Sequence, residues 1–200
     1  MALIVQKYGG TSVGDLDRIK GVAQRIKRYT DLGNQVVVVV SAMSGETNRL
    51  IGLGTELAAG VPDAQEMDVL TSSGEQVAIA LLCIALGNEG VPAKSMLAEQ
   101  LGIHTDSSFG KARIEKIDLG PLKELLGSGT VPVVAGFQGV DDNGRRTTLG
   151  RGGSDTSAVA LAAVLQADEC EICTDVDGVY TTDPKNHKKA KKINKISYDE

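Results

Sequence analysis

Residues 149–158, LGRGGSDTSA, place the guanidinium of Arg151 close to the carboxylate of Asp155 in a loop with three glycines. A helix follows this loop, and Ser154 or Asp155 can cap it. Capping does not need Arg151, whose planar fork matches a carboxylate in a bidentate pair. Because Asp155 would repel an anion bound so close to it, we expect Asp155 to orient a lysine or a magnesium ion, or to set the geometry of its neighbours.

Residues 7–15, KYGGTSVGD, form a second segment with chemical potential. Gly9 and Gly10 permit close backbone approach, and the amides near Thr11 are expected to open a helix that starts near Asp15. Such amides bind anions, and Lys7 adds a positive charge for phosphate oxygens. The segment is neither a Walker A loop nor the dinucleotide motif G-x-G-x-x-G. A plain turn explains the glycines equally well but leaves the lysine without a reason.

Two further segments carry weaker signals. In residues 71–75, TSSGE, we expect a glycine-bearing break before a long apolar helix, with Glu75 in its first turn, where acidic residues are common. Residues 174–184, TDVDGVYTTDP, leave a strand through two aspartates and a glycine turn, and the ring of Tyr180 could border an adenine. The lysine run that begins at Lys185 is either a solvated loop or the source of one nucleotide contact.

The elements that must position these segments alternate along the chain. Apolar runs rich in valine and isoleucine predict strands, buried on both faces, over residues 3–6, 35–41, 93–97, 131–137 and 169–174. Helical patterns cover residues 15–29, 63–86, 119–126 and 154–166. Alternation of this kind predicts an α/β fold with a mainly parallel sheet and helices on both faces. The polar loops follow strands, so we expect them to meet at the carboxyl edge of the sheet, where ligands bind.

Composition narrows the class of protein. The 200 residues carry a net charge of −5, which argues against a protein that coats nucleic acid. We find no secretory signal and no apolar run that approaches a membrane span, and therefore expect a cytoplasmic protein without a membrane partner. The cysteines, Cys83, Cys170 and Cys173, form no disulfide framework, and we interpret the last two as small buried hydrophobes. The two histidines lie far apart, so we expect no metal held by protein ligands alone.

Taken together and in order, six segments resemble the catalytic domain of the aspartate kinases, within the amino acid kinase family. They are KYGGTS, VVVVSAMSGET, TSSGEQ, VAGFQG, TTLGRGGSDTSA and CTDVDGVYTTDP, and they spread over nearly the whole chain. The resemblance implies a three-layer αβα sandwich and ATP-dependent phosphorylation of the side-chain carboxylate of L-aspartate to 4-phospho-L-aspartate. That reaction is the first step of lysine, threonine and methionine synthesis. It also implies that residues 1–200 are a kinase domain incomplete at its C-terminus, without the regulatory ACT domains.

The resemblance implies a role for each matching residue. Lys7 would neutralise charge on the transferred phosphoryl group, and Asp155 would align Lys7 with the reacting groups, so both would be catalytic. Aspartate would be bound by four side chains: Thr47, Glu75, Arg151 and Ser154. The nucleotide would be bound by Lys7, Gly9, Gly10, Ser41, Thr174, Asp175, Tyr180 and Lys185. Magnesium would be held through the ATP phosphates, with no metal site of the protein's own.

The sequence leaves other functions and other acceptors open. The acceptor could be acetylglutamate, glutamate or a nucleoside monophosphate, as in other members of the amino acid kinase family. The chain could also be an inactive nucleotide-binding fragment, or a subunit that acts through association. The resemblance implies a homo-oligomer, a dimer, or association with a regulatory chain.

Overall fold

The computed structural model describes residues 1–174, 178–182, 187 and 189–197. Five helices are described: α1 (Leu16–Asp31), α2 (Glu46–Leu57), α3 (Ala64–Asn88), α4 (Gly120–Gly127) and α5 (Gly153–Leu165), with a short 3-10 turn, η1 (Ala98–Leu101). The strands of the main sheet are β1 (Leu3–Tyr8), β2 (Gln35–Val40), β3 (Ala93–Met96), β6 (Val131–Ala135) and β9 (Glu169–Cys173). The remaining strands are β4 (Ile103–Thr105), β5 (Ile114–Ile117), β7 (Gln138–Val140), β8 (Arg146–Thr148), β10 (Val179–Tyr180) and β11 (Lys192–Ile193).

The main sheet has the strand order β3-β6-β2-β1-β9, and every pair in it is parallel. Its carboxyl edge therefore collects the residues that follow β1, β2, β6 and β9. Lys7 pairs in register with Val39 on one side and with Ile172 on the other. The predicted parallel sheet is confirmed, and it places Lys7 near the carboxyl end of the inner strand β1, at the edge where ligands bind.

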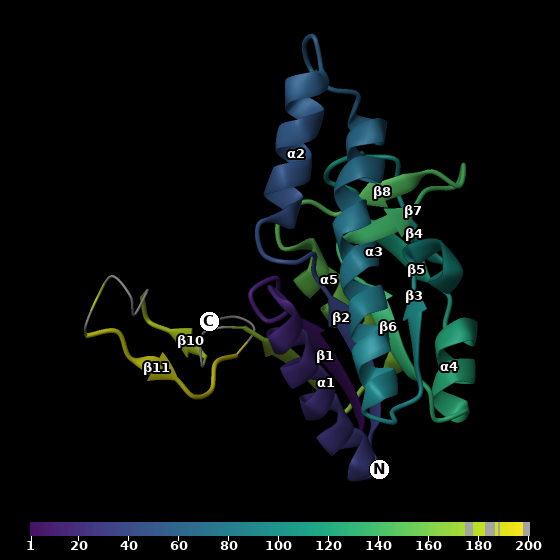
Figure 1. The fold of residues 1–200 in the computed structure, drawn as a ribbon, viewed down its shortest axis with the longest axis vertical. Coiled ribbons are helices and arrows are strands. Elements are labelled where there is room, and N and C mark those ends of the chain that lie inside the picture. The colour runs from purple at the N-terminus through teal and green to yellow at the C-terminus, as the bar shows by residue number, and fades with distance from the viewer. Residues whose placement is uncertain (175–177, 183–186, 188, 198–200) are drawn as a thin grey trace.

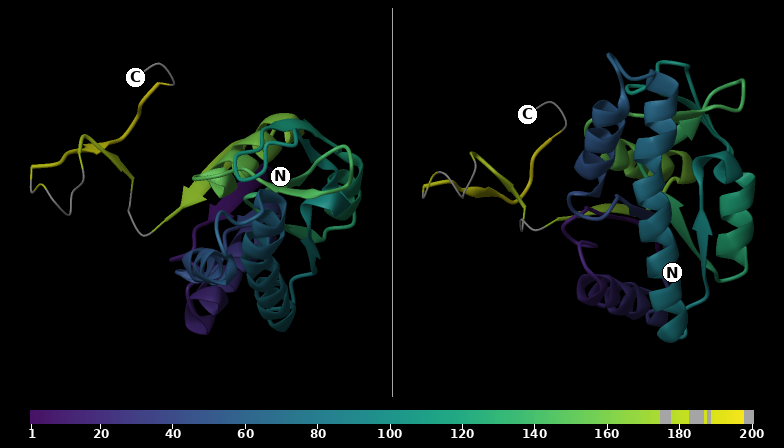
Figure 2. Two further views of the ribbon diagram at one scale, coloured as in Figure 1. Left: turned by 90° about the horizontal axis from the view of Figure 1, so that it is seen from above. Right: turned by 45° about the horizontal axis from the view of Figure 1, so that its top comes forward.

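The valine run of β2 shows why the sheet has two covered faces. Val36, Val38 and Val40 pack into a core with α1 and α3, while Val37 and Val39 pack into a second core with α4 and α5. Successive side chains of a strand point to opposite faces, so an unbroken apolar run buries both. Helices cover both sides of the sheet in Figure 1 and in the view from above in Figure 2, which gives the three-layer sandwich.

Two parts of the fold were not expected from the sequence. Helix α2 follows β2, but it buries only Leu50, so its apolar pattern is weak. A second sheet, in the order β5-β4-β7-β8, packs beside α3 and supports the loop that begins at Leu149. Its strands have three or four residues each, which is too short for a readable alternation.

The prediction that every strand is buried on both faces is wrong for β3, on which Lys94 is exposed, and for β9. Strand β9 pairs with β1 at the edge of the described sheet, and Cys170 and Ile172 on it are exposed. The interpretation of Cys170 as a buried hydrophobe is therefore wrong as well. Strands β10 and β11 form a separate antiparallel pair that projects away from the main body in both views of Figure 2.

Helix α3 is long and apolar enough to cross a membrane by length and composition alone. However, much of it is buried inside the molecule, and Asp68 and Glu75 on it are only 2% exposed each. Core helices satisfy the same length test, and α3 packs against both α1 and α2. We therefore interpret α3 as a core helix of the domain.

Candidate active site

The ammonium of Lys7 and the carboxylate of Asp155 meet at the carboxyl edge of the main sheet. Lys7 Nζ lies 2.7 Å from Asp155 Oδ1, and the two side chains are 12% and 50% exposed. β1 supplies the lysine and the first turn of α5 supplies the aspartate. This ion pair matches the expectation that Asp155 orients a lysine. The Asp155 side chain remains half exposed, so a ligand can still reach it.

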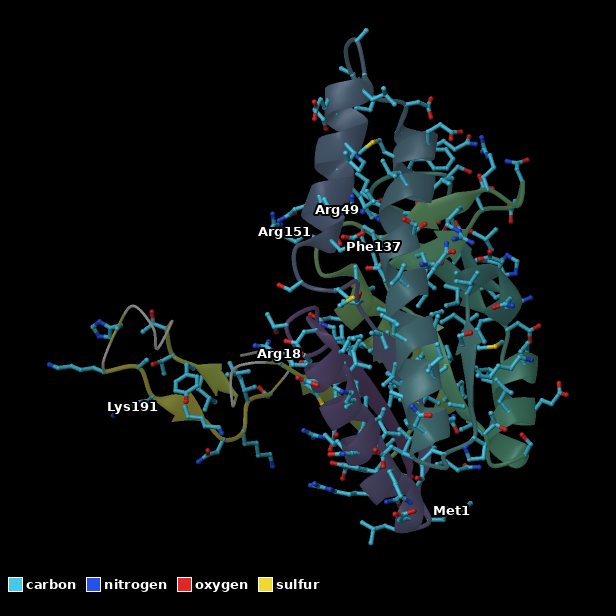
Figure 3. The ribbon with its side chains drawn as sticks, viewed as in Figure 1. Met1, Arg18, Arg49, Phe137, Arg151 and Lys191 are labelled. Atoms are coloured by element: carbon cyan, nitrogen blue, oxygen red, sulfur yellow. The ribbon has the colours of Figure 1, made fainter. Side chains whose placement is uncertain are left out.

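A cavity of about 630 Å³ opens beside this pair. It is lined by the four residues expected to bind aspartate, Thr47, Glu75, Arg151 and Ser154, by the Lys7–Asp155 ion pair, and by Ser41, which was expected at the nucleotide. Arg151 is an exposed residue on its wall, and Phe137, labelled beside it in Figure 3, is another wall residue. The cavity therefore combines an exposed cationic group, a buried carboxylate and hydroxyl groups, which suits a small zwitterion.

A second cavity of about 420 Å³ adjoins the first. Gly9, Gly10 and Thr11 line it from one loop, Ser44 and Gly45 from another, and Thr174 from the end of β9. Lys7, Ser41, Thr47 and Asn48 line both cavities. The lysine thus stands where the two cavities join, with its charge available to ligands on both sides.

Close backbone approach explains Gly10 in this second cavity. A Cβ atom there would lie 2.8 Å from the carbonyl oxygen of Ala42, closer than real side chains come. The carbonyl of Gly10 accepts a hydrogen bond from the Ser44 amide at 3.1 Å, so the two loops are held together. Glycine is therefore required by the packing of one loop on the other.

The expectation that the loop amides open helix α1 is wrong. The helix begins at Leu16, and Asp15 caps it by accepting from the Arg18 amide at 2.8 Å. Ser12 instead donates its amide to the carbonyl of Gly9. The glycine loop is a turn of its own, so any anion there depends on Lys7 and loop amides rather than on the dipole of α1.

The cap predicted for α5 is also wrong. Its N-cap is Gly152, with φ of 75°, and neither Ser154 nor Asp155 makes a side-chain cap bond. A left-handed residue is needed here, and glycine adopts it without strain. The carboxylate of Asp155, in the first turn, pairs with Lys7 instead of capping the helix.

Glu75 lies in the middle of α3 rather than after a break, which corrects the prediction for residues 71–75. The hydroxyls of Thr71, Ser72 and Ser73 donate to carbonyls of the preceding turn, so these polar residues stay helical. Gly74 is needed for close approach, since a Cβ there would lie 2.7 Å from that of Ala42.

This approach brings the Glu75 carboxylate to the end of β2. Its Oε1 accepts from the Ala42 amide at 2.9 Å, while Oε2 is buried without a partner among the described residues. Burial raises the pKa of Glu75 from 4.5 to about 7, although the Ala42 hydrogen bond acts in the other direction. A buried oxygen with no donor is what a ligand ammonium would satisfy.

The structure describes only some of the residues predicted to bind the nucleotide beyond its phosphates. Thr174 lines the second cavity, directly after β9. Tyr180 lies on β10, in the projecting pair of strands, and lines neither cavity. Asp175 and Lys185 lie outside the described residues.

Several residues of the large cavity were missed, among them Asp68, Gly110, Phe137 and Thr148. Asp68 and Thr71 precede Glu75 by seven and four positions, so the helical period placed them on one face of α3 with it. That signal was readable. Phe137 follows β6 of the main sheet, whereas Gly110 and Thr148 belong to segments that the second sheet brings to the cavity.

Among the described residues, no group of three histidine, cysteine or acidic side chains is placed to hold a metal ion. Magnesium bound through nucleotide phosphates needs only one or two carboxylates from the protein. Asp155, half exposed beside Lys7, fits that limited requirement.

Glycine-turn loops at the carboxyl edge of a parallel sheet, beside a lysine between two cavities, define an α/β protein of the kinase type. The model of the amino acid kinase family matches residues 2–200. The chain therefore belongs to the amino acid kinase family.

Individual relatives are more specific. The chain is 59% identical over 200 residues to an aspartokinase of Pseudomonas aeruginosa, covering 100% of this chain and 48% of that protein. The structure of an aspartate kinase from Synechocystis superposes with a TM-score of 0.80 and 51% identity, over 95% of this chain and 31% of the other. E. coli aspartokinase III, solved in complex with aspartate and ADP, gives a TM-score of 0.79 and 31% identity over 96% and 53% of the two chains. The chain thus spans about half the length of the curated relatives it matches.

Proposed function

We propose that this chain forms the aspartate-binding and phosphoryl-transfer part of an aspartate kinase, which converts ATP and L-aspartate to ADP and 4-phospho-L-aspartate. The observation that carries the proposal is the Lys7–Asp155 pair at the junction of two cavities. One cavity has the groups for an amino acid, and the other has a glycine turn suited to phosphates. The E. coli relative solved with aspartate and ADP supports the same pair of ligands.

The chemistry that we assign to Lys7 is electrostatic. Phosphoryl transfer passes through a loose transition state whose charge is spread over the phosphoryl oxygens. A fixed ammonium beside those oxygens stabilises the charge without rearranging during the reaction. Asp155 holds the ammonium in place at 2.7 Å. The glycine turn at Gly9 and Gly10, with Ser41, would surround the phosphates on the other side.

Aspartate would occupy the large cavity with its side-chain carboxylate toward Lys7. In this pose Arg151 pairs with the α-carboxylate, and Glu75 receives the ammonium on its unpartnered Oε2. Thr47 and Ser154 line the same cavity and add hydroxyl groups. The attacking carboxylate is ionised at neutral pH, so the transfer needs no general base.

We assign Thr174, Asp175, Tyr180 and Lys185 to the nucleotide, as the resemblance implies, with Thr174 supported by its place in the second cavity. Magnesium carried by the ATP phosphates would supply further positive charge there, with Asp155 the nearby carboxylate. We also propose that the protein works in the cytoplasm, that residues 1–200 belong to one kinase domain, and that the active form is a dimer or associates with a regulatory chain.

A direct assay separates the proposed acceptor from its alternatives. The full-length protein would be supplied with MgATP and either aspartate, glutamate, acetylglutamate or uridylate, and ADP release would be measured. We expect turnover with aspartate, and hydroxylamine should trap the acyl phosphate product. Preference for any of the other acceptors would overturn the assignment, and absence of turnover with all four would favour a non-catalytic protein.

A further inference from the structure

Asp68 is a buried carboxylate on the cavity-facing side of α3 that the mechanism above does not use. It is 2% exposed, and all three of its donors are neutral groups. Oδ2 accepts from the amides of Thr148 and Gly110, at 2.8 and 2.9 Å, and Oδ1 accepts from Thr148 Oγ1 at 2.7 Å. The carboxylate therefore joins three segments that are distant in the sequence.

The segment around Gly110 is itself fixed on the second sheet. The Ala112 amide donates to the carbonyl of Thr148 at 2.8 Å, which pairs this loop with the end of β8. Ser107 Oγ donates to the buried carboxylate of Asp141 at 2.8 Å, and Arg145 pairs with the same carboxylate at 2.7 Å. Asp68 thus links α3 to a segment that is otherwise attached to the second sheet.

The other segment leads directly to Arg151. Thr148 ends β8, and three positions later comes the guanidinium that lies on the cavity wall. Gly150, with φ of 77°, passes so close to Gly110 that an added Cβ would lie 3.1 Å from the carbonyl oxygen of Gly110. The positions of Thr148 and Gly110 consequently determine where the chain carrying Arg151 runs.

We propose that Asp68 is a positioning residue for the large cavity, here called the acceptor cavity because aspartate would bind in it. The three hydrogen bonds of Asp68 hold the end of β8 and the Gly110 loop against α3. In this way Asp68 sets the distance between Arg151 on one wall and Glu75 on α3. The inference rests on the proposed function, because its consequence is the affinity for aspartate. It assigns Asp68 no contact with the reacting atoms.

The chemistry of the contacts allows a discriminating pair of variants. Asp68→Asn keeps an oxygen for the two amides and places an NH₂ group toward Thr148 Oγ1, which can accept as well as donate. It removes the charge but can keep all three hydrogen bonds. Asp68→Ala removes all three hydrogen bonds, so the buried amide of Thr148 and the part-buried amide of Gly110 both lose this acceptor.

The test is a kinetic comparison of wild-type, Asp68→Asn and Asp68→Ala full-length protein. We expect Asp68→Ala to raise the KM for aspartate by about 10- to 100-fold, as misplacement by about 1 Å does elsewhere. The KM for ATP should stay within about twofold, because the nucleotide side is not attached to Asp68. Asp68→Asn should restore most of the aspartate affinity.

Thr148→Val is the second variant, in case Asp68→Ala fails to fold. It removes the hydroxyl donor to Asp68 and retains both amide donors. We expect the KM for aspartate to rise about threefold and the KM for ATP to stay unchanged. Titration of aspartate by calorimetry should give the same order of affinities as the kinetics.

Three results would overturn the inference: an unchanged aspartate KM in both Asp68→Ala and Thr148→Val, an equal loss in Asp68→Asn and Asp68→Ala, or parallel rises in both KM values. Equal losses would mean that the charge of Asp68 acts on the ligand directly. If the wild-type protein does not phosphorylate aspartate, the proposed function itself fails, which the wild-type control reveals separately.

Discussion

Replacing Glu75 by glutamine should change how the stability of the domain depends on pH. Glu75 is 2% exposed, and its carboxylate accepts a hydrogen bond from the Ala42 amide. Its pKa is raised from 4.5 to about 7, so the folded protein holds a proton that the unfolded chain has released. Stability therefore falls as pH rises from about 4.5 to 7, and the full penalty persists above pH 7, with a size of roughly 3 kcal/mol.

Glutamine cannot ionise, so Glu75→Gln abolishes this pH-dependent penalty. Its buried amide has a desolvation cost of its own, but that cost does not change with pH. The diagnostic quantity is therefore the difference in unfolding free energy between variant and wild type, compared at pH 5 and pH 8. We expect this difference to move in favour of the variant by about 2 to 3 kcal/mol from pH 5 to pH 8.

Urea denaturation of both proteins at the two pH values measures this quantity. Glu66→Gln is the matched control, because Glu66 is an exposed glutamate on the same helix and should give no such change. A difference between Glu75→Gln and wild type that is the same at pH 5 and pH 8 would refute the reasoning. It would mean that Glu75 is ionised in the folded protein throughout this range.

Three further predictions concern the ligands. The KM for aspartate should rise about tenfold from pH 8 to pH 6 at saturating MgATP, because Glu75 must be ionised to receive an ammonium; a flat profile would contradict this role. Arg151→Ala should raise the aspartate KM at least about tenfold with little change for ATP, and an unaltered aspartate KM would contradict the carboxylate clamp. Gly10→Ala should weaken ATP binding in calorimetry, because the new methyl would lie 2.8 Å from the Ala42 carbonyl, whereas Gly52→Ala on α2 meets nothing within 4 Å and should bind ATP normally.

The main sheet could be predicted because its valine runs and the intervening helical patterns have long, unambiguous periods. Lys7, Ser41 and the loop of Arg151 could then be placed together, since parallel strands bring their carboxyl ends to one edge. Helix caps were predicted less well. Asp15 caps α1 with its side chain, as polar N-cap residues commonly do. Helix α5 instead begins after Gly152, which has a left-handed conformation, and the polar residues Ser154 and Asp155 nearby led to the wrong cap being predicted.

The wall of the acceptor cavity shows what the sequence could not supply. Asp68 shares a helix face with Glu75, and that spacing was available from the start. Its partners Thr148 and Gly110 lie in short strands and loops whose pairing depends on tertiary contacts rather than on local pattern. Hydrogen bonds between segments distant in the sequence stabilise these contacts of Asp68 with Thr148 and Gly110. A local sequence pattern cannot predict such bonds.

Lys7→Ala is the decisive variant, because we propose that Lys7 stabilises the charge of a phosphoryl group passing between the two cavities. The kcat of wild-type and variant protein would be measured with MgATP and aspartate, and the affinity of each ligand by calorimetry. We predict that kcat falls by about 10²- to 10³-fold or more while both ligands still bind, because the lost interaction is made mainly in the transition state. A variant that retains wild-type kcat, or one that loses only ligand affinity, would contradict the account.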